Sequence, residues 1–108
     1  MKFTVLAIGK LKEQYLRDGV AEFVKRLRVY GGVTITELSE SKMSGSGDRT
    51  ARLQAVNDEG ERVLKGVSNH AYVVLLDVYG KTTSSEALAA RIAELEVSGT
   101  SEMVFIIG

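Results

Sequence analysis

Cysteine is absent from this chain of 108 residues. The chain therefore contains no disulfide, no thiolate nucleophile and no thiolate-bound metal. Long hydrophobic runs are also lacking. None approaches the roughly 20 residues that span a bilayer, and residues 1–9 are too short and too strand-like for a signal peptide. We expect a soluble, cytoplasmic protein without a membrane partner.

An excess of charge of one sign is lacking too, because 14 Lys and Arg residues balance 14 Asp and Glu residues. The net charge therefore does not indicate a nucleic-acid partner. The distribution is uneven, with six cations and three anions over residues 10–30 but one cation and four anions over residues 86–108. The cations Lys10, Lys12 and Arg17 either follow RNA phosphates or lie on the solvated face of a helix, which is the commoner arrangement.

Four short segments have the composition of β-strands in a chain long enough for one domain, residues 1–108. Tyr72–Leu76 is uninterrupted and rich in β-branched and aromatic residues, which predicts an interior strand buried on both faces. Phe3–Ile8 predicts a second interior strand. Val33–Leu38 mixes apolar and polar residues and predicts an edge strand. Met103–Ile107 is apolar on both faces and needs cover on both sides.

Three helices are predicted between these strands. Apolar residues recur at helical spacing over residues 12–30, which predicts the first helix. Gly31 and Gly32 then end it. A second helix is expected over residues 50–65 with Asp48 as its N-cap, and a third follows a capping box formed by Thr83 and Glu86. The strict alternation predicts an α/β fold, with a mostly parallel four-stranded sheet and helices on both faces.

The connection over residues 39–48 is rich in serine and glycine and predicts a linker. Its Gly45-Ser46-Gly47 sequence lacks the other residues of a nucleotide-binding signature. We therefore do not expect this connection to bind phosphate.

Ligands of open α/β sheets bind beyond the carboxyl ends of the strands, where Gly9, Gly108 and residues 77–80 are predicted to lie. Asp77 is the one carboxylate at such an end. A structural role in capping the following turn and a binding role are equally supported by the residues. The sequence contains no nucleophile and base pair, no metal-binding cluster and no phosphate loop, so we name no catalytic residue and expect no metal.

Four separated segments carry a resemblance to a known family, namely AIGKLKEQYLRDGVAEFVKRL, DEGERVL, AYVVLLDVYGKTTSSEALA and FIIG. The chain resembles SPOUT-class methyltransferases, and among them the family of ribosomal RNA large subunit methyltransferase H. The resemblance implies an α/β-knot fold, a homodimer, and methyl transfer from S-adenosylmethionine to N3 of a pseudouridine in the RNA of the large ribosomal subunit.

By position, the resemblance implies that Leu76 and Gly108 contact the methyl donor and that Asp77, Tyr79 and Gly80 form the loop beside it. In the family, the FIIG segment continues into a glycine-rich loop, the helix and strand of the knot, and a basic tail. The 108 residues match the N-terminal two-thirds without this knot portion, so we expect no turnover by this form. The alternative is a non-catalytic binding or assembly module that uses the open sheet edge and the basic first helix.

Overall fold

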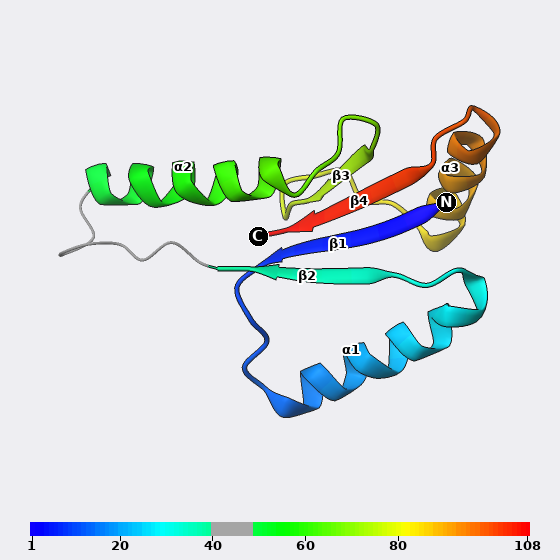
Figure 1. The fold of residues 1–108 in the computed structure, drawn as a ribbon, viewed down its shortest axis with the longest axis horizontal. Helices are drawn as coiled ribbons and strands as arrows, with labels where there is room; N and C mark the ends of the chain where they lie inside the picture. Colours follow the sequence, from blue (N-terminus) through cyan, green and yellow to red (C-terminus); the bar gives the residue numbers. More distant parts are fainter. Residues whose placement is uncertain (40–48) are drawn as a thin grey trace.

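The computed structural model describes residues 1–39 and 49–108, which form a parallel sheet and the helices that join its strands (Figure 1). The elements, in chain order, are β1 (Lys2–Ile8), α1 (Gln14–Leu27), the 3-10 helix η1 (Arg28–Tyr30), β2 (Thr34–Leu38), α2 (Arg49–Lys65), β3 (Tyr72–Leu76), α3 (Ser85–Val97) and β4 (Glu102–Ile107). The predicted linker beyond Ser39, including Gly45-Ser46-Gly47 and the Asp48 cap, lies outside the described residues.

The strand order is β2-β1-β4-β3, and all three pairings are parallel. The α/β fold class predicted from the alternation of elements is confirmed. So are the interior position of β1 and the edge position of β2. Parallel pairing requires crossovers, and the helices α1, α2 and α3 supply them.

The predicted interior position of Tyr72–Leu76 is wrong, because β3 pairs with β4 alone and forms an edge of the sheet. Its side chains are correspondingly open, with Val73, Leu75 and Leu76 exposed by 43%, 63% and 50%. The interior strand is β4, whose Met103 and Val104 have no exposed surface. An uninterrupted apolar run indicates that both faces of a strand are to be buried, but it does not specify the strands with which that strand pairs.

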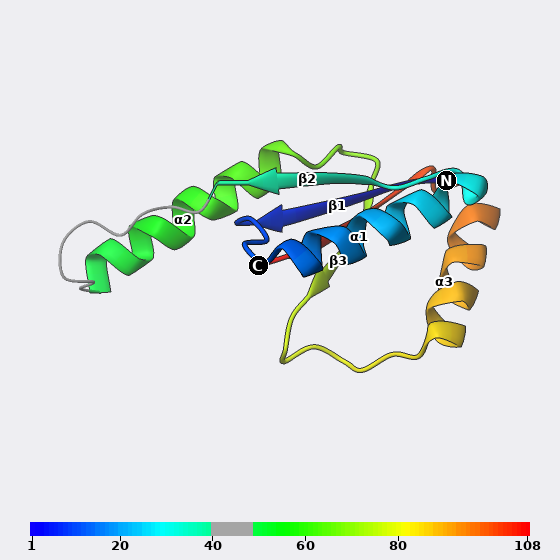
Figure 2. The same ribbon diagram turned by 90° about the horizontal axis from the view of Figure 1, so that it is seen from below.

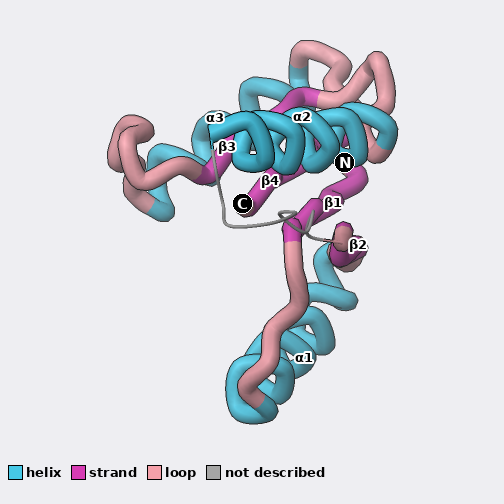
Figure 3. The backbone as a smooth tube through the Cα atoms, turned by 90° about the vertical axis from the view of Figure 1, so that its left-hand side faces the viewer, coloured by secondary structure: helices cyan, strands magenta, loops and turns pink. Residues whose placement is uncertain are grey.

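Different helices lie on the two faces of the sheet, as predicted. On one face, Leu6, Val104 and Ile106 form a buried cluster against which Val63 of α2 and Val67 pack. On the other face, an apolar groove of about 300 Å³ is lined by side chains from β1, β4, α1, η1 and α3, among them Phe3, Val5, Leu27, Tyr30, Leu88, Ile92 and Phe105. Figure 3 shows α2 and α1 on opposite sides of the sheet.

The start of α3 differs from the predicted capping box. Ser84 is the N-cap residue, and its hydroxyl accepts a hydrogen bond of 3.0 Å from the amide of Ala87. Thr83 and Ser84 are both suitable caps, and the acidic residue three positions after Thr83 favoured the wrong one. Figure 2 shows how far the connection from β3 carries the chain from the sheet before α3 begins.

Candidate functional site

The carboxyl ends of the four strands lie along one edge of the sheet, since all the strands are parallel. In the register of the sheet, Ile107 of β4 is flanked by Ala7 on one side and by Leu76 on the other. Gly108 therefore emerges between the end of β1 and Asp77. Neighbouring strands are about 4.8 Å apart, so the sheet brings together the predicted methyl-donor residues Leu76, Asp77 and Gly108.

Asp77 organises the turn that follows β3. Its Oδ1 accepts a hydrogen bond of 3.2 Å from the amide of Tyr79, and its carbonyl oxygen accepts one of 2.9 Å from the amide of Gly80. A Cβ atom on Gly80 would lie 3.1 Å from that same carbonyl oxygen, so this position favours glycine. The turn-capping role of Asp77 is thus observed, and the turn presents Tyr79 to solvent with 93% of its surface exposed.

A basic hollow lies on the other side of Gly108. The chain leaves β1 at Gly9, whose amide donates a hydrogen bond of 2.7 Å to the carbonyl of Leu38, and then turns away from the sheet. The hollow has a volume of about 290 Å³ and is lined by Lys10, Leu11, Lys12, Arg17 and Glu37. Because β1 and β3 flank β4, two strand spacings, or about 10 Å, separate the start of this loop from Asp77.

The three predicted RNA-binding cations do not have equivalent surroundings. Nε of Arg17 donates a hydrogen bond of 2.8 Å to the carbonyl of Leu11, and Nη2 donates one of 3.3 Å to the carbonyl of Lys12. Arg17 is thus attached to the loop that carries the two lysines. Sequence reasoning treated all three as one charged surface, and it missed the carboxylate of Glu37 in the same hollow.

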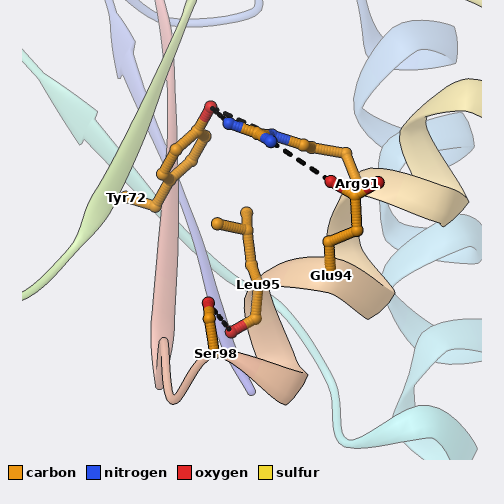
Figure 4. A network of polar contacts seen from close by, with 5 residues as sticks. All are labelled: Tyr72, Arg91, Glu94, Leu95 and Ser98. Atoms are coloured by element: carbon orange, nitrogen blue, oxygen red, sulfur yellow. Dashed lines mark hydrogen bonds and ion pairs between the residues drawn. The ribbon is translucent and has the colours of Figure 1, made fainter.

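A second polar cluster joins α3 to β3 and was not predicted (Figure 4). Nη2 of Arg91 donates a hydrogen bond of 3.0 Å to the Tyr72 hydroxyl, and Nη1 donates one of 3.2 Å to Glu94. The Arg91 guanidinium lies 5.3 Å from the Tyr72 ring centroid. The Tyr72 hydroxyl, followed by Glu94, raises the pKa of Arg91 above its usual value. Together with the nearly buried Leu95, this cluster anchors the helix that follows the Asp77 turn.

Across residues 1–39 and 49–108, no group of three or more histidine or acidic side chains is placed to hold a metal ion. The helices of that part of the chain are all too short or too polar to cross a membrane. The described side chains at the carboxyl edge are apolar residues of the strand ends, the cations Lys10, Lys12 and Arg17, and the single carboxylates Glu37 and Asp77.

Comparison with known proteins matches this chain to a family described as "Predicted SPOUT methyltransferase" over residues 1–108. The chain belongs to the SPOUT methyltransferase family. This chain is also 40% identical to the ribosomal RNA large subunit methyltransferase H of Halothermothrix orenii and 41% identical to that of Bifidobacterium adolescentis. It is 34% identical to the protein of the same name from Streptococcus mutans.

Each of these alignments includes all 108 residues of this chain and 68% of the relative. The family resemblance carried by the four sequence segments is thereby confirmed. The carboxyl edge described above belongs to a methyltransferase.

Proposed function

We propose that this chain forms the methyl-donor and RNA-facing part of an S-adenosylmethionine-dependent enzyme that methylates N3 of a pseudouridine in large-subunit ribosomal RNA. The names of the relatives support ribosomal RNA as the substrate. The observation that carries the proposal is the register that sets the Asp77 turn beside Gly108, with the basic hollow on the other side. An enzyme with this substrate works in the cytoplasm.

The residues at the edge fit the adenosine part of the methyl donor. Leu76 and Ile107 are neighbours in register and are exposed by 50% and 41%, so they offer an apolar surface to a flat base. Gly108 follows Ile107 directly and carries no side chain of its own beside this surface. When bound, S-adenosylmethionine supplies an electrophilic methyl group, and the chain's own contribution is to orient it toward the base nitrogen.

The 108 residues alone form only part of an enclosure, and we propose that in this form they do not catalyse turnover. A small-molecule pocket buries 70 to 90% or more of its ligand, whereas Leu76 and Tyr79 are half or almost fully exposed. Each 100 Å² of apolar ligand surface that stays exposed to solvent weakens binding by about 2.5 kcal/mol. We expect dissociation constants near the millimolar range.

Amide chemical-shift changes during titration with S-adenosylmethionine test the proposal. We expect weak, saturable changes at residues 76–80, at Gly108 and at Gly9. Leu76→Glu should abolish them. Leu75→Glu is the matched control, because Leu75 pairs with Ile106 and lies on the opposite face. No change at these residues would contradict the methyl-donor site, and micromolar affinity with measurable turnover would contradict the proposed inactivity.

A second candidate, a binding or assembly module, is favoured by the two edges of the sheet. Neither β2 nor β3 has a partner strand on its outer side among the described residues, and Val73, Leu75 and Leu76 of β3 are exposed on the faces of the sheet. Such edges recruit other chains. We propose that the protein self-associates as a homodimer in either case, and retention of dimerisation without any binding of S-adenosylmethionine would favour the module.

A further inference from the structure

Arg17 occupies a position in α1 that its charge alone would not favour. It is the fourth residue of the helix, close to the amino end, where the helix dipole disfavours cations. No acidic side chain lies in the first turn. The carbonyl groups of the preceding loop accept hydrogen bonds from this guanidinium, and the Glu37 carboxylate lines the same hollow.

The two carbonyls that accept from Arg17 belong to consecutive residues. Nε reaches Leu11 at 2.8 Å, and Nη2 reaches Lys12 at 3.3 Å. A planar guanidinium with its donors in a rigid fork can span two adjacent carbonyls, and a lysine ammonium cannot do so with the same geometry. This bridge fixes the backbone on which Lys10 and Lys12 are carried into the hollow.

We propose that Arg17 is a positioning residue, which holds the Lys10–Lys12 segment so that both ammonium groups reach RNA phosphates from one hollow. The inference rests on the proposed RNA-binding function of the chain. It assigns the phosphate contacts to the two lysines. A loop without this bridge would lose conformational entropy when RNA binding orders it. Because Arg17 orders the Lys10–Lys12 segment beforehand, binding does not include that entropic cost.

Two variants separate positioning from direct contact. Arg17→Lys keeps the charge but loses the fork, and Arg17→Gln loses both. If Arg17 positions the loop, both variants weaken binding of a short fluorescein-labelled single-stranded RNA by about two- to tenfold. Both also leave the slope of log affinity against log salt unchanged, since no phosphate contact is lost. Fluorescence anisotropy across a salt series measures both quantities.

A slope reduced by roughly 0.7 in Arg17→Gln but retained in Arg17→Lys would show a direct phosphate contact and overturn the proposal. Lys25→Gln is the charge-matched control, because Lys25 lies in the last turn of α1 and does not line the hollow. It should change the slope little.

Backbone ¹⁵N order parameters give a readout that does not depend on RNA. We expect those of Leu11 and Lys12 to fall in both Arg17 variants and to stay unchanged in Lys25→Gln. Unchanged values in the Arg17 variants would overturn the positioning role. The double variant Lys10→Gln with Lys12→Gln should lower the salt slope by roughly 1.4, and an unchanged slope there would instead overturn the RNA-binding function.

Discussion

Glu102, the first residue of β4, connects three segments at the amino end of the sheet. Its Oε1 accepts a hydrogen bond of 2.8 Å from the Ser68 hydroxyl. Its Oε2 accepts one of 3.4 Å from the Thr4 hydroxyl and lies 3.6 Å from Nζ of Lys2. The Ser68 hydrogen bond above all, and then the charge of Lys2, lower the pKa of Glu102 below its usual 4.5 despite partial desolvation.

A carboxyl group whose pKa is lowered by folding stabilises the folded state above its unfolded pKa and loses this contribution as the pH falls through the folded value. We therefore expect Glu102→Gln to lower the urea midpoint at neutral pH. The difference from the parent chain should shrink as the pH falls below the usual carboxyl pKa of 4.5, and vanish once the pH is below the lowered pKa of folded Glu102, where the glutamate is protonated as well. Urea denaturation at several pH values measures this. Glu96→Gln on α3 is the control, and a difference that is constant with pH would contradict the prediction.

The existence of each helix and strand could be predicted from the sequence pattern, but which strands pair with one another could not be predicted in full. The composition of Phe3–Ile8 and Val33–Leu38 was sufficient to place β1 inside the sheet and β2 at its edge. The order of β3 and β4 depends on which crossover packs on which face, and no single segment contains that information. Hence the strand with the most conspicuous apolar run lies at an edge.

The candidate site shows the same division. Strand ends were predictable, because carboxyl ends of parallel strands share one edge, and the sheet does bring Leu76 and Gly108 together. The bridge from Arg17 to the loop carbonyls was not predictable, since it depends on the side-chain torsions of one arginine and the path of a short loop. The one available signal was a cation near a helix start.

Core substitutions test the corrected strand order. Met103→Ala on the interior strand removes a fully buried side chain and should cost about 2–5 kcal/mol of unfolding free energy. Leu75→Ala on β3 removes a side chain that is 63% exposed and should change stability by no more than about 0.5 kcal/mol. Urea denaturation of both variants provides the measurement. Equal losses would show that β3 is as buried as its composition suggested.

The whole molecule is more extended than its length requires. Its radius of gyration is 16.0 Å, compared with about 13 Å for a compact domain of this size. The apolar row of α1 remains uncovered, with Leu16, Val20, Phe23 and Leu27 exposed by 37–63%. Apolar patches of this kind mark sites of association.

We expect the chain to self-associate through this row. Light scattering across a dilution series should show a mass that falls as the protein is diluted. Phe23→Glu should shift the equilibrium toward the monomer, because it places a charge in the middle of the row. Gln14→Glu, at the start of the same helix, adds the same charge outside the row and should have little effect. A monomer at every concentration would rule out this mode of association.

The pairing of β1 with β4 also determines when the core can form during synthesis. Thr4 and Glu102 are in contact although 98 positions separate them in the chain. Closing a loop of that length costs about 4 kcal/mol of chain entropy beyond a constant term. The β1-α1-β2 unit can assemble while translation continues. The edge of β1 that faces β4 stays unpaired until β4 has left the ribosome. A protein of this topology therefore acquires its central ladder late, and until then its most apolar strands depend on the nascent-chain environment for protection.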